Sequence, residues 1–164
     1  MKQATIYTIL TFSTVALCLD RLTKILVRQK LLAQPGVFIF KSDFLTLRFI
    51  FSLNENLSFS IYLPKILIYI LTLTILIALS WLLKNQIKKN ALATSIFLTL
   101  IIASAAGNLY DRIVYGGVID FISLKIFHFQ WAIFNLADIF ITFGVIGLLI
   151  LELRKSNQSS AISH

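Results

Sequence analysis

Two long runs without a charged residue place the strongest constraint on the fold. They extend from Ile66 to Leu83 and from Ala91 to Tyr110, and each approaches or reaches the roughly 20 apolar residues with which a helix crosses a bilayer. The whole chain of 164 residues is 58% hydrophobic, with a mean hydropathy of +0.87. A soluble domain of average composition is far less apolar. The sequence therefore predicts an α-helical integral membrane protein.

Two further runs complete a prediction of four transmembrane helices in a single membrane domain, residues 1–155. One run ends at Asp20, and the other contains a single charge, Asp138. The first is longer than the roughly 7–15 apolar residues of a secretory signal peptide, so we expect it to stay attached. The predicted spans are residues 5–26, 64–83, 91–112 and 132–153, with outer links at 28–63 and 113–131 and a polar tail at 156–164.

The basic residues indicate a membrane orientation rather than nucleic acid binding. The net charge is +8, but the fifteen Lys and Arg residues are scattered and form no basic face with interleaved aromatic residues. Lys84, Lys88 and Lys89 crowd the link between the second and third spans, and Arg154 and Lys155 follow the fourth. By the positive-inside rule these segments are cytoplasmic. Both termini would then be cytoplasmic, although the first outer link also carries basic residues.

Two segments of the outer links have the period of a β-strand. Apolar and mostly polar residues alternate from Leu45 to Asn54, and a similar alternation runs from Asp120 to Phe127. Gln34-Pro35-Gly36 predicts a turn before the first strand, and Gly116-Gly117 a turn before the second. We expect a small sheet on the outer face of the membrane.

Polar residues near the ends of the spans are the first candidates for function. Such groups are costly in hydrocarbon and usually face the interior of a helix bundle. Asp20 precedes Lys24 by four residues, the favourable order for a helical ion pair, so a local salt bridge and a role in a site are both open. Asn108, Asp111 and Arg112 share one helix face, where they form either a structural network or part of a site.

Two aspartates could form a catalytic pair. Asp138 follows Asn135 by three residues on the fourth span, and Asp120 lies just outside the same span. Two carboxylates in a partly dry site cannot both ionise easily, so one stays protonated, as in aspartic proteases. Such a pair can deprotonate an attacking water and protonate the leaving nitrogen of an amide. Asp111 and Arg112 could form a supporting ion pair beside it.

Other site chemistries have weaker support. Zinc would need His or Cys ligands, and Cys18, His128 and His164 share no ligand spacing. A serine triad would need His128 beside a nucleophile such as Ser123. The outer aspartates could bind Mg²⁺, but no phosphate-binding glycine loop accompanies them. We expect neither a metal nor another cofactor.

Two hypotheses from other functional classes stay open. The same carboxylates could form a proton relay in a small proton-coupled transporter or channel subunit. Such proteins often contain internal repeats or interrupted helices, and the spans show neither clearly. In a membrane scaffold or chaperone the polar residues would only hold helices together, which would leave the two aspartates without partners.

Five motifs occur in order along most of the chain, between Asp20 and Asp138. They are DRLTK, NENLSFS, GNLYDR, GVIDFI and FNLAD. Together they resemble bacterial lipoprotein signal peptidase, also called signal peptidase II. The resemblance implies four transmembrane helices, a small periplasmic sheet and an amphipathic element in the cytoplasmic (inner) membrane.

The resemblance also implies an activity and a set of site residues. Asp120 and Asp138 correspond to the catalytic aspartates of that family. Residues that line or support the site correspond to Asp20, Lys24, Asn54, Asn108, Asp111, Arg112, Asn135 and Ala137. The implied substrate is a prolipoprotein, whose signal peptide is cut just before a diacylglyceryl-modified cysteine. Membrane lipid is the other expected partner, and we expect a monomer.

The sequence departs from the family pattern beside Asn54. Asn56 stands where a glycine is usual, and Leu57 and Ser58 stand where small alanines are usual. Asn tolerates left-handed backbone geometry better than most residues, so it can replace glycine there. We expect one of the outer links, residues 34–43 or 54–64, to cover the site.

Overall fold

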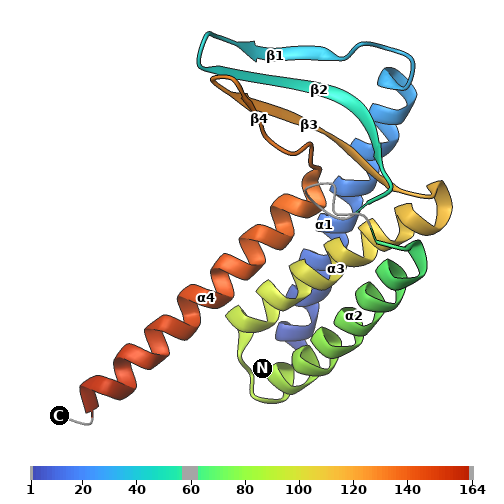
Figure 1. Ribbon diagram of the computed structural model, residues 1–164. Helices are drawn as coiled ribbons and strands as arrows, with labels where there is room; N and C mark the ends of the chain where they lie inside the picture. Colours follow the sequence, from blue (N-terminus) through green and yellow to red (C-terminus); the bar gives the residue numbers. More distant parts are fainter. Residues whose placement is uncertain (1, 57–62, 163–164) are drawn as a thin grey trace.

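The computed structural model describes residues 2–56 and 63–162. The helices are α1 (Lys2–Leu31), α2 (Lys65–Lys88), α3 (Leu92–Tyr115) and α4 (Leu136–Ile162). The strands are β1 (Val37–Lys41), β2 (Leu45–Asn54), β3 (Val118–Ile126) and β4 (Phe129–Gln130). Figure 1 shows the sheet at one end of the helices, opposite the α2–α3 turn and both chain termini.

Three helices in the described part of the chain are long and apolar enough to cross a membrane. They are α2, α3 and residues 136–158 of α4. α1 has 30 residues, about 45 Å at 1.5 Å per residue, but it is not among the three. Hydroxyl side chains in its first half and charged residues from Asp20 onward make it less apolar. Three of the four predicted spans therefore have the length and composition of a membrane-crossing helix, and the prediction of four transmembrane helices is not confirmed.

The helix α4 begins at Leu136, later than the predicted span that starts near residue 132. The preceding residues pair with β3 instead of entering the helix. The Trp131 N–H donates to the Leu124 carbonyl at 2.9 Å, and the Phe134 N–H donates to the Ile122 carbonyl at 3.1 Å. At its other end α4 continues through most of the predicted polar tail, as far as Ile162.

The helix α3 forms the centre of the bundle, because it packs against α1, α2 and α4. Its buried residues include small and polar side chains such as Ser95, Ala103 and Ser104. On α2, in contrast, Ile68 is the one residue classed as buried. Small residues let helix backbones approach closely, which is how helices commonly associate in membranes.

Two glycines on α4 allow its close approach to α3. A Cβ atom on Gly144 would lie 2.6 Å from Ile101 Cγ1 and 3.0 Å from the Phe97 carbonyl oxygen. A Cβ atom on Gly147 would overlap the Phe97 ring. The contact between the two helices therefore has no room for a side chain at either position.

We expect Gly147→Leu to lower the free energy of unfolding by about 1–3 kcal/mol, the usual cost of overpacking. Val145→Leu is the control, because it also enlarges a side chain on α4 but at a position that is 43% exposed. Thermal unfolding in detergent compares the two variants with wild type. Equal unfolding temperatures for the two variants would contradict the proposed packing.

The four strands form one antiparallel sheet in the order β1-β2-β3-β4. The predicted strand Leu45–Asn54 is present with these bounds, and the second predicted strand is β3. The predicted turn before it is also present, with Gly116 in the left-handed conformation that ends α3. The strands β1 and β4, which were not predicted, lie at the two edges of the sheet.

A β-bulge in β2 decides which of its side chains reach the helices. Phe49 pairs with Ile122, whereas Ser52 pairs with Asp120, so the register shifts between them. Paired residues share a face of the sheet, and a shift of one residue exchanges the faces. Beyond the bulge, Ser52 and Asn54 therefore lie on the same face as Asp120.

The two links proposed as covers differ in what the structure describes. Residues 34–43 contain β1, at the edge of the sheet, and begin with a bend at Gln34 that closes the turn after α1. The other link includes residues 57–62, which lie outside the described residues. Leu57 and Ser58, which depart from the family pattern, are among them. Asn56 is described, and its N–H donates to Asn54 Oδ1 at 3.1 Å.

Candidate active site

Asp120 lies on β3 where the sheet meets the helices, with 2% of its surface exposed. Asn54 Nδ2 donates to one carboxylate oxygen at 3.0 Å, and Asn135 Nδ2 donates to the other at 2.6 Å. Asn54 comes from the paired strand β2, and Asn135 immediately precedes α4. Two amides from different elements therefore fix the orientation of this buried carboxyl group.

Asp138 is fixed by a reciprocal cap at the start of α4. Asn135 Oδ1 accepts the Asp138 N–H at 3.1 Å, and Asp138 Oδ2 accepts the Asn135 N–H at 3.0 Å. This is the capping-box pattern, which satisfies two backbone donors that a helix start leaves unpaired. A carboxylate in the first turn is also favoured by the helix dipole. Unlike Asp120, Asp138 is only half-buried.

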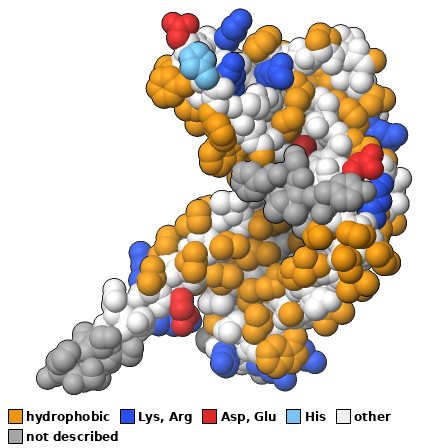
Figure 2. Space-filling view, viewed as in Figure 1, with side chains coloured by type: hydrophobic (Ala, Val, Ile, Leu, Met, Phe, Trp, Pro, Cys, Tyr) orange, Lys and Arg blue, Asp and Glu red, His pale blue; other side chains and the backbone are white. Residues whose placement is uncertain are grey.

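Two asparagines connect the aspartates. The Asn135 side chain binds Asp120 and also donates to Asn108 Oδ1 at 3.3 Å. Asn108 Nδ2 donates to Asp138 Oδ1 at 3.1 Å, and its own oxygen accepts from Lys24 Nζ at 2.7 Å. The two carboxyl groups therefore belong to one hydrogen-bonded network. Figure 2 shows the molecular surface hollowed between the sheet and the helices, in the region where these elements meet.

Ala137 contributes to the site through its backbone. Its N–H donates to Asp20 Oδ1 at 3.2 Å, and none of its surface is exposed. Asp20 thus binds the first turn of α4 as well as its own helix neighbour Lys24, at 3.0 Å. Gly107 makes room for it, because a Cβ atom there would lie 3.1 Å from Asp20 Oδ2. Asp20 therefore forms the local ion pair with Lys24 and also lies beside the site.

Burial raises the pKa of Asp120 to about 7, and the nearby carboxylate of Asp138 adds to the rise. Hydrogen bonds from Asn54 and Asn135 and the charge of Lys24 act in the opposite direction. The ordinary pKa of an aspartate is about 3.9. Near neutral pH the Asp120 carboxyl group therefore exchanges readily between its protonated and ionised forms.

Four charged residues form a cluster beside the two aspartates, which we call the charge cluster: Asp20, Arg21, Lys24 and Asp111. Arg21 binds Asp20 at 2.7 Å and Asp111 at 2.6 Å. Lys24 binds Asp20 at 3.0 Å and Asp111 at 2.8 Å. The cluster joins α1 to α3 and is electrically neutral. Arg21 was not among the predicted site residues.

The predicted ion pair between Asp111 and Arg112 was wrong. Among the described residues, Asp111 pairs with Arg21 and Lys24 and not with Arg112. Consecutive helix positions point about 100° apart, so Asp111 faces α1 while Arg112 faces elsewhere. The Arg112 guanidinium donates to the Asn56 carbonyl at 3.4 Å. It also lies close enough to Asp120 and Asp138 for electrostatic interaction.

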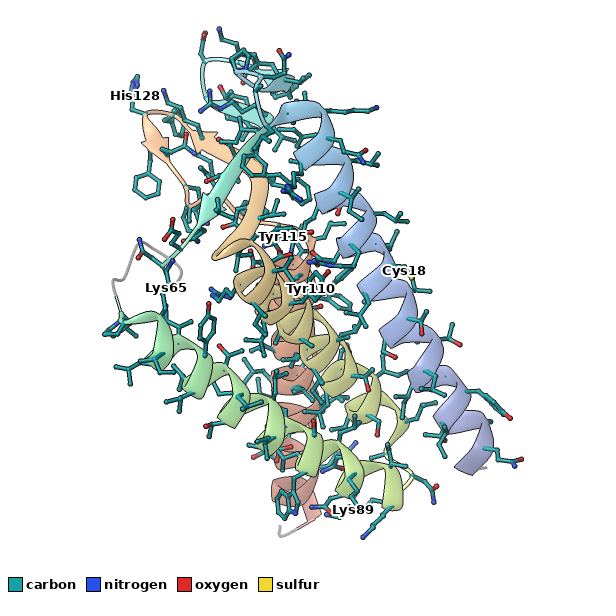
Figure 3. All side chains as sticks on the ribbon, turned by 90° about the vertical axis from the view of Figure 1, so that its right-hand side faces the viewer. Cys18, Lys65, Lys89, Tyr110, Tyr115 and His128 are labelled. Carbon is teal, nitrogen blue, oxygen red and sulfur yellow. The ribbon has the colours of Figure 1, made fainter. Side chains whose placement is uncertain are left out.

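The structure gives no support to the metal and serine alternatives. Within the described residues, no three His, Cys, Asp or Glu side chains are grouped so that they could hold a metal ion. Ser123 accepts hydrogen bonds from Arg48 and Gln130. His128 is exposed in the turn between β3 and β4 and points away from the helices in Figure 3.

Comparisons with known proteins identify the family of this chain. Residues 12–154 match the family model described as signal peptidase (SPase) II. The chain belongs to the signal peptidase II family. The lipoprotein signal peptidase of Pelagibacter ubique is 37% identical over 86% of this chain and 84% of its own length. That of Anaplasma phagocytophilum is 33% identical over 90% of this chain and 92% of its own length.

Solved structures show the same fold. A bacterial membrane enzyme determined at 2.3 Å resolution superimposes with a TM-score of 0.79 and 29% identity, over 93% of this chain and 92% of the other. A second one, determined at 1.9 Å resolution, gives a TM-score of 0.73 and 30% identity. Family membership and the apolar helices make this signal peptidase II a multi-pass peptidase of the bacterial inner membrane. The transporter and scaffold hypotheses receive no such support.

Proposed function

We propose that this signal peptidase II removes the signal peptide from diacylglyceryl-modified prolipoproteins by cutting immediately before the lipidated cysteine. Asp120 and Asp138 form its catalytic dyad. The observation that carries the proposal is their convergence on Asn135, one from β3 and the other from the first turn of α4. The relatives of similar length are lipoprotein signal peptidases, which supports a prolipoprotein as the substrate of this chain.

The dyad acts as a general acid and a general base. The ionised aspartate takes a proton from a water molecule, whose oxygen attacks the carbonyl carbon of the scissile amide. The protonated aspartate then gives its proton to the amide nitrogen as the carbon–nitrogen bond breaks. The products are the carboxyl end of the signal peptide and the free amine of the lipidated cysteine. Because the pair shares one proton, its titration belongs to both carboxyl groups together.

The supporting residues hold this pair in place. Asn54 and Asn135 orient Asp120, and Asn108 orients Asp138. Lys24 supplies a buried positive charge that favours an ionised carboxylate nearby. Preorganised partners of this kind reduce the rearrangement that a reaction needs. We propose a monomeric enzyme, since the dyad and its supporting residues need no residue from a second copy of the chain.

The membrane brings the substrate to this site. We propose that α1 is the fourth transmembrane helix, since each charge of the charge cluster is paired with one of opposite sign and so costs less at depth. The basic α2–α3 link and both termini are cytoplasmic, and the sheet and the dyad lie at the outer face. The acyl chains of the substrate stay in the bilayer while its amide reaches Asp120 and Asp138, so anchoring replaces a deep cleft.

The lipid requirement gives a direct test of the substrate. Purified enzyme is incubated with the same prolipoprotein with and without its diacylglyceryl group, and peptide release is followed by mass spectrometry. We expect kcat/KM to be at least about 100-fold higher for the lipidated form, because its acyl chains fix the cysteine beside the scissile amide at the membrane face. Equal rates for both forms would contradict this substrate assignment.

The pH dependence of activity tests the role of Asp120. Activity should fall as the pH rises through about 7, the raised pKa of Asp120, because the pair then loses its shared proton. Asn54→Ala removes a hydrogen bond that favours the ionised carboxylate, so the pKa of Asp120 should rise further. We expect the alkaline limb of kcat/KM to move to higher pH by about 0.5–1 unit. Asn85→Ala, near the distant end of α2, is the control and should leave the pH profile unchanged. If the alkaline limb of kcat/KM in Asn54→Ala stayed in place or moved to lower pH, the role given to Asp120 would be contradicted.

The same pKa has a consequence for stability. The folded pKa of Asp120 lies above the value of about 3.9 in the unfolded chain. The folded state therefore binds more protons between these two values, and this group contributes less to stability as the pH rises from about 4 to 7.

A further inference from the structure

A cavity of about 80 Å³ lies between α1, α3 and β3, apart from the two aspartates. One face of α1 supplies most of its polar lining, with Arg21, Lys24, Arg28 and Gln29. Arg21, Lys24 and Arg28 are three and four positions apart, so they follow one another along the helix surface, and Gln29 follows the lining residue Ile25 by four positions. Tyr115, near the end of α3, lines the opposite wall, and Figure 3 shows it on the side of α3 that faces α1.

The cavity carries an excess positive charge. Asp20 and Asp111 balance Arg21 and Lys24 within the charge cluster. Arg28 has no carboxylate within ion-pair distance in the described part of the chain, and its guanidinium lies over the Tyr115 ring, 4.6 Å from the centroid.

The excess charge favours an anionic oxygen ligand, and a phosphate matches the donor geometry of arginine. Arg28 and Gln29, which both line the cavity, are exposed, so both side chains can contact such a ligand.

The surroundings of the cavity are apolar. On α1, Leu22, Ile25 and Leu26 are between 46% and 57% exposed. On α3, Val114 is 49% exposed. An anionic group bound here would have hydrocarbon-facing side chains beside it, which suits a ligand with a charged head and acyl chains.

We propose that this cavity binds the phosphate headgroup of an anionic phospholipid whose acyl chains lie along the apolar surface of α1 and α3. The phosphate interacts with the Arg28 guanidinium and the Gln29 amide. The diacylglyceryl group proposed for the substrate has no phosphate, so this lipid is a separate ligand. The site requires only that the chain resides in a membrane, and its test does not depend on peptidase activity.

Native mass spectrometry of the full chain in detergent tests the site. Wild type is titrated with phosphatidylglycerol and with diacylglycerol, which lacks the phosphate. We expect tighter binding of phosphatidylglycerol and an affinity about tenfold lower in Arg28→Gln, the usual effect of one charge-assisted hydrogen bond. Lys30→Gln is the matched control, because it removes the same charge from α1 at a residue that does not line the cavity.

A second variant keeps the test independent of folding. Gln29→Leu removes an amide donor without changing the charge, and we expect a loss of about threefold. Thermal unfolding without added lipid checks that each variant is folded. The proposal would be overturned if Arg28→Gln and Lys30→Gln bound phosphatidylglycerol with equal affinity. It would also be overturned if wild type bound diacylglycerol as tightly as phosphatidylglycerol. Displacement of the lipid by an equal concentration of inorganic phosphate would identify free phosphate as the ligand and would also overturn it.

Discussion

Asp120→Asn and Asp138→Asn are each expected to lower the rate of signal-peptide release by at least about 10³-fold. An acid or base placed on the reacting atoms contributes about 10²–10⁴-fold, and a pair that shares one proton fails when either member is lost. An asparagine amide can still hydrogen-bond, but it cannot hold or release the proton. Both variants should keep the fold, since Asn matches Asp in shape and loses only one of the two hydrogen bonds that each carboxyl group accepts.

Asp43→Asn is the matched control for these variants. Asp43 is an exposed aspartate between β1 and β2, on the same side of the molecule as the dyad. It should retain wild-type kcat/KM and unfold at the wild-type temperature. Substantial activity in either Asp120→Asn or Asp138→Asn would rule out that aspartate as an essential member of the dyad.

Lys24→Met is expected to cause the largest loss of stability, about 3–5 kcal/mol in the free energy of unfolding. Lys24 has 1% of its surface exposed and binds Asp20, Asp111 and Asn108 within 3.0 Å. Methionine fills a similar volume but leaves two buried carboxylates with Arg21 as their remaining cation in the charge cluster. Removing one partner from a buried ion pair costs far more than the pair itself contributes.

Lys155→Met provides the comparison on the surface. Lys155 binds Glu152 at 3.3 Å, and both side chains are more than 60% exposed. Exposed ion pairs contribute about 0–1 kcal/mol, so this variant should unfold at nearly the wild-type temperature. A Lys24→Met enzyme as stable as Lys155→Met would show that the charge cluster does not hold α1 against α3.

The sequence predicted the parts of the fold that local patterns encode. The strand from Leu45 to Asn54 was predicted from its alternation, and the end of α3 from Gly116-Gly117. The strand β1 was not predicted, because four consecutive apolar residues, VFIF, have no period of two. The bulge in β2 also escaped prediction. It depends on the pairing with β3, yet it decides that Asn54 reaches Asp120.

The candidate site shows a similar division. Helical spacing led to Asn108 and Asp111, and Asn135 and Asp138 stand at the spacing of a capping box. Arg21 was missed because its partner Asp111 lies 90 residues away in the chain. The sequence did contain a signal for Arg21. It is a basic residue next to Asp20, and Asp111 on α3 also needed a cation as partner. Only the packing of α1 on α3 distinguishes Arg21 from Arg112 as that cation.

The most direct measurement is the mass of both products released by the purified wild-type enzyme from a diacylglyceryl-modified prolipoprotein, with Asp120→Asn and Asp138→Asn alongside. The account predicts one signal peptide ending at the residue before the lipidated cysteine, one lipoprotein beginning with that cysteine, and neither product from the two variants. A different cleavage position, or the same products from either variant, would contradict it.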